Sequence, residues 1–309
     1  MEETIVRFGK HGDVVGILSE GPRGKSNTLL ILLNTASEHC TGVGRLYVKI
    51  ARSLSDVLPV LRFDYSGNGD SPPRHGAKSF LDSALENTQE ALDFCEKYFG
   101  GMKVLLAGVC FGGDTAYAAA LKDERVIGIA MMNSYFFNYG IFPDLDNETY
   151  KTFKQRTYDG THNLLGVYLK KIFSKEDWKR LISRQSAFSF GRLLRTITHY
   201  GRKKIFEGET VNIIEKYSNY FWKNLLDAGR HSILFYAEND DSYSFYKASI
   251  GKYRKSQSIK EGNSRTEVVQ DEHSNWFLSQ NSQEKLLKKI RTWVQERINS
   301  EIINEAEHD

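Results

Sequence analysis

The sequence predicts an α/β fold in which a mostly parallel sheet is flanked by helices, with a helical lid inserted between late strands. Short apolar runs alternate with amphipathic stretches along residues 1–133. One of these runs, at 103–109, breaks into a glycine turn and leads directly into a helical stretch, as in a parallel crossover. The alternation stops over 134–229 and resumes over 230–309. We therefore expect a core formed by 1–133 and 230–309, and a lid formed by 134–229.

Each predicted element follows the hydrophobic period of its segment. Strands are predicted at residues 3–8, 13–18, 28–34, 59–63, 103–109 and 126–132, and later at 231–237 and 266–269. Helices are predicted at residues 43–56, 78–98 and 111–122, and from about residue 281 to the end of the chain. The helix at 111–122 is rich in alanine, which allows close packing on a sheet.

The glycine turn at the end of the 103–109 run carries a single cysteine, Cys110, with Gly108 two residues before it and Gly112 two residues after it. This is the pattern of a nucleophile elbow, where a strand turns so sharply into a helix that only glycine fits on either side of the apex. The apex side chain stands at the N-terminus of the helix, where the macrodipole favours a thiolate over a thiol. A buried structural cysteine beside an ordinary glycine turn is the alternative.

A nucleophile of this kind needs an acid and then a histidine later in the chain. Asp240 follows the predicted strand at 231–237 by three residues and is the first candidate for the acid, with Asp241 and Glu238 as alternatives. His273 is the one histidine that lies after a late strand and before the closing helix, which favours a catalytic base over an exposed loop residue.

Acyl chemistry also needs hydrogen-bond donors for an oxyanion. One donor is expected from the backbone N–H of Phe111, the residue after the nucleophile. The other is expected from the loop after the third strand, where Ala36, or else Thr35, is in position.

The predicted lid is basic, whereas the whole chain carries a formal net charge of only +3. Residues 151–230 contain 17 Lys and Arg against 7 Asp and Glu. Such a separation of charge favours an anionic partner. Because the basic residues are interleaved with aromatic and aliphatic ones, we favour a phosphate-bearing small molecule or an acidic carrier protein over nucleic acid. A basic face that is merely solvated fits the pattern equally well.

Several classes of protein are disfavoured by the composition. No apolar run is long enough to span a membrane, and the first twenty residues do not resemble a secretory signal. Three widely spaced cysteines argue against a disulfide framework and favour a reducing cytoplasm, with Cys95 and Cys40 in packing roles. No spacing suggests a metal site or a P-loop, and Gly67-Asn68-Gly69 lacks a third glycine at dinucleotide spacing. The sequence does not determine the oligomeric state.

Taken together, these features resemble the α/β-hydrolase superfamily over almost the whole chain outside the lid. The segment from Leu61 to Ser71, Leu-Arg-Phe-Asp-Tyr-Ser-Gly-Asn-Gly-Asp-Ser, is similar to the segment that follows the fourth strand in that superfamily. The chain resembles most closely the cysteine-bearing hydrolases associated with exosortase systems. Those share the Gly-x-Cys-x-Gly elbow, a loop like that of Asn34, His39 and Gly42–Leu46, and an acidic turn like Glu238-Asn239-Asp240.

The resemblance implies Cys110 as nucleophile, Asp240 as acid and His273 as base, with no metal and no organic cofactor. The chain departs from the superfamily at the oxyanion loop, where Asn34-Thr35 replaces the common His-Gly pair.

A cysteine in the elbow favours a covalent thioester intermediate, because a thiolate attacks readily and is also a good leaving group. We therefore expect an enzyme of the thioesterase or esterase kind that handles an activated acyl group, such as a thioester of coenzyme A or of a carrier protein. An acyltransferase with an amine, alcohol or thiol acceptor is the alternative. A ligand-binding module without turnover is a third, which the intact set of candidate triad residues disfavours. The acyl group and the pathway are not determined by the sequence.

Overall fold

The computed structural model describes residues 2–22, 27–35, 38–73, 80–134, 220–225, 227–248, 251, 264–270 and 277–306. These residues contain one sheet of eight strands in the order β1-β2-β4-β3-β5-β6-β7-β8. The strands are β1 (Glu3–Phe8), β2 (Val14–Ser19), β3 (Thr28–Leu33), β4 (Val60–Phe63), β5 (Lys103–Val109), β6 (Val126–Met132), β7 (His231–Ala237) and β8 (Ser264–Val269). β2 is antiparallel to β1 and β4, and all later neighbours pair in parallel, which confirms the predicted class.

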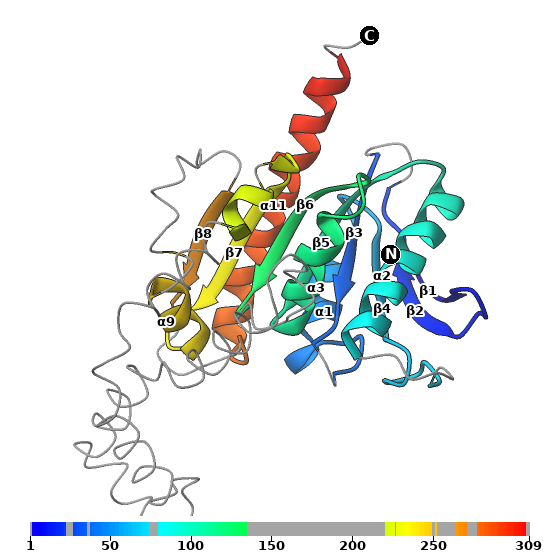
Figure 1. Cartoon of the computed structure of the whole chain (residues 1–309), viewed down its shortest axis with the longest axis horizontal. Coiled ribbons are helices and arrows are strands. Elements are labelled where there is room, and N and C mark those ends of the chain that lie inside the picture. The colour runs from blue at the N-terminus through cyan, green and yellow to red at the C-terminus, as the bar shows by residue number, and fades with distance from the viewer. Residues whose placement is uncertain are drawn as a thin grey trace, which may run out of the picture. The chain divides into compact units, whose positions relative to one another are not determined.

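Helices cover both faces of the sheet (Figure 1). They are α1 (Leu46–Leu54), α2 (Phe80–Phe99), α3 (Phe111–Ala120), α9 (Asp241–Ala248) and α11 (Gln280–Ala306), with a short 3-10 helix η1 at Val43–Arg45. On one face, α1 and α11 contact each other and pack on apolar side chains of the central strands. On the other face, α3 packs on β3, β5 and β6, and α2 packs beside α3. Burial of these apolar faces is what holds the layers together.

Two predicted elements differ in detail from the structure, and one helix was not predicted. The helix expected at 43–56 divides into η1 and α1, because Gly44 and Arg45 both adopt left-handed backbone conformations, with φ of 57° and 61°. β8 begins at Ser264, two residues earlier than predicted. Helix α9 was not predicted, because its sequence is short and mostly polar.

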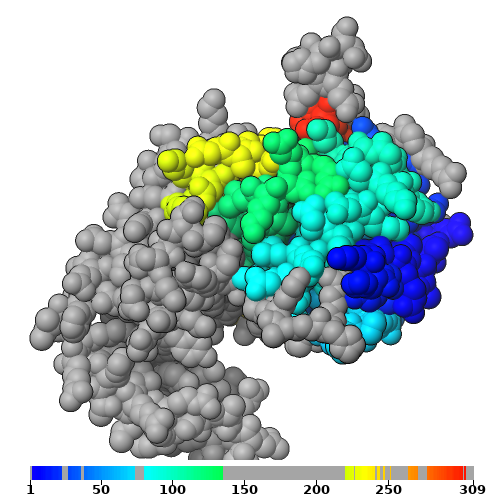
Figure 2. Space-filling model, turned by 45° about the vertical axis from the view of Figure 1, so that its right-hand side comes forward, coloured from blue at the N-terminus to red at the C-terminus, as the bar shows by residue number. Residues whose placement is uncertain are grey.

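Most of the predicted lid, residues 135–219, lies outside the described residues, so the lid remains a prediction. The segment 220–225, which we assigned to the end of that lid, is described and packs against α3. The ring of Phe221 stacks on Tyr117 with their centroids 4.6 Å apart, and Figure 2 shows this segment (yellow) beside α3 (green). None of the helices within the described ranges is both long and apolar enough to cross a bilayer.

Candidate active site

Cys110 occupies a sharp turn between β5 and α3, at the carboxyl edge of the parallel strands. Its backbone has φ 53° and ψ −115°, a conformation that L-residues rarely adopt and that persists only where the surrounding structure enforces it. Here the N–H of Cys110 donates to the carbonyl of Met132 at the end of β6 (2.7 Å). Its carbonyl accepts from the N–H of Gly113 (3.0 Å) and the hydroxyl of Ser134 (3.3 Å). The backbone geometry is therefore that of the predicted elbow.

The two glycines of the motif are required by close approaches of the backbone. A Cβ on Gly108 would lie 2.2 Å from the carbonyl carbon of Gly112. A Cβ on Gly112 would lie 2.0 Å from the carbonyl oxygen of Leu33, at the end of β3. Both are well inside van der Waals contact, so no larger residue fits at either position without a shift of the backbone.

The thiol of Cys110 is half-buried, and its pKa is raised to about 12. Burial is the largest cause, followed by the negative charge of Asp114, with a smaller contribution from Asp240. Hydrogen bonds from the N–H of Phe111 and the side chain of Thr35 act in the opposite direction. The helix N-terminus was expected to favour a thiolate, but the pKa of Cys110 is shifted in the opposite direction, because burial and nearby carboxylates raise it.

The raised pKa predicts how Cys110 reacts with iodoacetamide. Only the thiolate reacts, so the alkylation rate should rise about tenfold per pH unit from pH 7 to pH 9, without a plateau. Asp114→Asn removes a buried negative charge, which lowers the pKa of Cys110, so the rate at a given pH should increase. Mass spectrometry of the labelled peptide measures the rate, with Cys110→Ala as the unlabelled control. A rate that is independent of pH below 7 would instead indicate a preformed thiolate–imidazolium pair.

Asp240 follows β7 and is buried, with 2 % of its surface exposed. Its backbone N–H donates to the carbonyl of Ala237 (3.1 Å), which closes the turn after the strand. Its Oδ1 accepts the N–H of Ser242 (2.9 Å) and also the Ser242 hydroxyl, so the carboxylate caps the start of α9. Asp240 is also close enough to Cys110 to raise the pKa of that thiol. The alternative acid Glu238 is exposed.

The structure describes some of the predicted site residues and not others. Cys110, Phe111 and Asp240 lie at the same edge of the sheet, at the carboxyl ends of β5 and β7. His273 and Ala36 lie outside the described residues, as does the side chain of Asp241. The roles of these three residues remain predictions.

The loop after β3 is held beside Cys110 by the last residue of the strand and the first residue of the loop. Parallel pairing places Leu33 opposite Gly108. The buried hydroxyl of Tyr47 then joins the two strand ends, donating to the carbonyl of Leu33 (2.6 Å) and accepting the N–H of Val109 (2.9 Å). The next residue, Asn34, is fully buried and donates to the carbonyl of Phe63 (2.9 Å).

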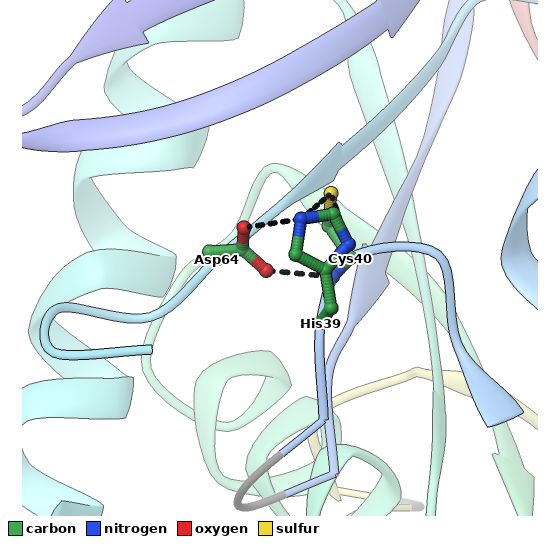
Figure 3. Close-up of side chains that lie close together, drawn as sticks. All are labelled: His39, Cys40 and Asp64. Atoms are coloured by element: carbon green, nitrogen blue, oxygen red, sulfur yellow. Dashed lines mark hydrogen bonds and ion pairs between the residues drawn. The ribbon is translucent and has the colours of Figure 1, made fainter. Parts of the chain in front are cut away.

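The carboxylate of Asp64, after β4, holds both ends of this loop. Its Oδ1 accepts the side-chain N–H of Asn34 (3.2 Å) and the backbone N–H of Cys40 (2.6 Å). Its Oδ2 accepts the N–H of Asp70 (3.0 Å) and lies 3.3 Å from Nε2 of His39 (Figure 3). The sequence did not reveal this anchor, because its members come from two separate loops, after β3 and after β4. Asp64 lies within the segment Leu61–Ser71, and the likeness of that segment to the superfamily was the available signal.

His39, Cys40 and Asp64 also form a candidate metal cluster, with ligand atoms within 4.8 Å of one another. However, the N–H of Thr41 donates to Nδ1 of His39 (3.2 Å), so a neutral ring carries its proton on Nε2. That proton points between Asp64 and Asp70, whose Oδ2 atoms both lie 3.3 Å away. A metal on Nε2 would move the proton to Nδ1, against the N–H of Thr41. The hydrogen bonds therefore favour a loop anchor over a metal site.

Cys40 itself is a poor nucleophile. Its pKa is raised to about 12, first by burial and then by the charge of Asp64. Cys95 is fully buried in α2, and its pKa is likewise raised to about 12 by burial. All three cysteines carry free thiols, and Cys110 is the one that is not fully buried.

Three solved structures share this fold over nearly their full lengths. DcsB, solved in complex with a substrate analogue, is 14% identical, with 96% of this chain and 99% of that chain covered and a TM-score of 0.55. A thermophilic esterase from Thermogutta terrifontis is 13% identical, with 96% and 100% covered and a TM-score of 0.52. The haloalkane dehalogenase DatA from Agrobacterium tumefaciens C58 is 15% identical, with 96% and 97% covered and a TM-score of 0.52.

At these identities the structural likeness shows the fold alone, and the esterase and the dehalogenase differ from each other in activity. A search of curated proteins found no match. The family model described as alpha/beta hydrolase fold matches residues 39–273, which include the elbow and both later candidate positions of the triad. The chain therefore belongs to the α/β-hydrolase fold family.

Proposed function

We propose that this protein is an acyl-handling hydrolase of the thioesterase or esterase kind, which forms a covalent acyl intermediate on Cys110. The backbone of Cys110 carries the proposal: its φ of 53° presents a half-buried thiol at the start of α3, beside the N–H of Phe111. A purely structural cysteine gains nothing from that strained geometry, whereas a nucleophile does. The similarity to cysteine-bearing hydrolases associated with exosortase systems supports the same choice of nucleophile.

In the proposed mechanism, His273 acts as the base and Asp240 orients it. Because the pKa of Cys110 is raised to about 12, the resting nucleophile is a neutral thiol and must lose its proton as it attacks. The C–S bond forms while the thiol proton passes to the imidazole and the carbonyl electron pair moves to oxygen. When the carbonyl re-forms, the bond to the leaving group breaks and the imidazolium returns the proton to that group. Water, activated by the same imidazole, then hydrolyses the acyl-cysteine.

Activated acyl groups are the favoured substrates. Exchange of one thioester for another is nearly balanced in energy, so a coenzyme A or carrier-protein thioester can acylate Cys110 readily. The excess of Lys and Arg in residues 151–230 suits a phosphate-bearing pantetheine group or an acidic carrier. An acyltransferase remains the second candidate, because an acyl-cysteine reacts with amines and thiols more readily than with water.

Intact mass spectrometry tests the proposal directly. The protein is incubated with a panel of p-nitrophenyl esters and acyl-coenzyme A thioesters of short and long chains. We expect the mass to increase by one acyl group in the wild type, and no increase in Cys110→Ala. Cys95→Ala serves as the matched control, since it removes a buried thiol from α2 and should leave the adduct unchanged.

Release of the acyl group separates the two candidates. Decay of the adduct in water supports a hydrolase, whereas decay only after addition of an amine or thiol supports a transferase. If neither adduct nor turnover occurs across the panel, or if the adduct persists in Cys110→Ala, the proposal is wrong.

A further inference from the structure

A cluster of three aromatic rings lies directly beside the elbow. The ring of Phe111, the residue after the nucleophile, has its centroid 5.0 Å from the centroid of Phe80, at the start of α2. Tyr65, in the loop after β4, packs edge-on against both rings, with its centroid 6.4 Å from that of Phe111 and 6.0 Å from that of Phe80. These are the separations of favourable aromatic pairs, so the three rings hold one another in place.

The aromatic cluster is buried at its base and exposed at its outer face. Tyr65 is fully buried, Phe111 is half-buried and Phe80 is 38 % exposed. Phe80 lies at the carboxyl edge of the sheet, because α2 begins after β4 and leads into β5, and both of these strands pair in parallel with β3. An apolar ring exposed beside a half-buried thiol is a surface that an apolar ligand can cover, with a gain in free energy proportional to the area buried.

The sheet places the aromatic cluster and the candidate acid on opposite sides of Cys110. The strand order runs β4-β3-β5-β6-β7, so Tyr65 follows a strand on one side of β5 and Asp240 follows a strand on the other. Figure 1 shows α2 and α9 on these two sides. In the proposed mechanism, Asp240 orients the imidazole that protonates the leaving group, so the leaving group is expected on the β7 side. The acyl chain, which is the other substituent of the carbonyl carbon, then extends towards β4.

We propose that the rings of Phe80 and Phe111 bind the chain of the acyl group and select an apolar one, either a medium-length or longer aliphatic chain or an aryl ring. The inference rests on the proposed function and names its substrate class. A short group such as acetyl has little apolar surface to bury against the rings. A charged chain such as succinyl would lose part of its hydration there, and the two phenyl rings offer no hydrogen bond in exchange.

Chain-length selectivity tests this role. In the wild type we expect kcat/KM to be about tenfold higher for hexanoyl- than for acetyl-coenzyme A, because each added methylene contributes up to about fourfold when it is fully buried. Phe80→Ala removes the exposed ring and should bring this ratio close to one, whereas Phe80→Leu keeps an apolar side chain and should keep most of it. Tyr98→Ala is the matched control, because Tyr98 is a 50 % exposed aromatic residue of the same helix, about 27 Å from Phe80 along its axis.

Labelling of Cys110 gives a second measurement that does not depend on turnover. N-hexylmaleimide and N-ethylmaleimide react with the same thiol, and mass spectrometry of the labelled peptide gives the two rates. Their ratio, divided by the ratio for a small free thiol, reports whether an apolar chain is bound beside Cys110. We expect a preference for the hexyl probe in the wild type and in Tyr98→Ala, and its loss in Phe80→Ala.

The two measurements separate failure of the inference from failure of the proposed function. If the wild type forms acyl adducts but Phe80→Ala keeps the hexanoyl-to-acetyl ratio, the inference is wrong and the proposed function stands. A wild type that turns over succinyl- faster than butyryl-coenzyme A has the same meaning. If the wild type forms no adduct with any acyl donor, the proposed function is wrong. Loss of the hexyl preference in Phe80→Ala would then support the apolar site alone, and an unchanged preference would overturn that site as well.

Discussion

Asparagine at position 240 is expected to lower kcat about 10³- to 10⁴-fold while leaving the protein folded. Asp240 has two separable roles in this structure. Its Oδ1 caps α9 by accepting from Ser242, and asparagine caps helices about as well as aspartate does. Its negative charge, in the proposed mechanism, orients His273 and stabilises the imidazolium that forms during attack. The substitution removes the charge and keeps the cap.

Steady-state kinetics with an acyl thioester and urea unfolding at 25 °C distinguish the two roles. The free energy of unfolding should fall by less than about 1 kcal/mol, since only the interaction of the charge with the helix dipole is lost. Glu238→Gln is the matched control, because Glu238 is an exposed carboxylate two residues earlier. Full activity in Asp240→Asn, with Asp241→Asn inactive, would assign the acid to Asp241.

The features most reliably predicted from the sequence are those that depend on local geometry. The apolar run at 103–109 and the glycines at 108 and 112 are sufficient to predict a strand, a strained apex and a helix, and the structure contains all three. The parallel order of the central strands follows from the same alternation, because a strand, helix and strand in sequence form a right-handed crossover. The fold class and the elbow were therefore predictable from short segments.

Properties that depend on tertiary contacts were not predictable in this way. The predicted direction of the Cys110 pKa shift was wrong. The position at the start of α3 can be predicted locally, whereas burial, which raises the pKa, is set by the whole fold. Asp114 is in the first turn of that helix, so the sequence did contain the signal of an opposing charge. What was missing was its burial, which leaves its field poorly screened.

The anchor of the loop after β3 was also not predictable from a single sequence. Asn34 and Asp64 are 30 residues apart, and nothing in the sequence indicates that one carboxylate accepts from both ends of the loop. Similarly, the sequence places Tyr47 on an amphipathic helix and gives no sign of the partners of its hydroxyl. Only the structure shows that it joins the ends of β3 and β5.

Alanine at position 112 should destabilise the protein by about 3–5 kcal/mol, the range of severe overpacking against atoms that cannot move aside. In an ordinary helix, replacing glycine by alanine stabilises by about 1 kcal/mol, so the expected sign is reversed here. The reason is that the added Cβ would lie 2.0 Å from the carbonyl oxygen of Leu33 and 2.9 Å from that of Asn34. Both are backbone atoms, and the carbonyl of Leu33 is fixed by its hydrogen bond from Tyr47 and by the pairing of Leu33 with β5.

Urea unfolding of Gly112→Ala measures the loss, with Gly100→Ala as the control. Gly100 also has a left-handed backbone (φ 77°), but a Cβ there would have no atom within 4 Å, so only about 1 kcal/mol should be lost. Any folded fraction of Gly112→Ala should also form the acyl adduct more slowly, because relief of the clash moves the loop after β3 away from Cys110. Wild-type stability in Gly112→Ala would mean that α3 does not approach β3 as closely as described.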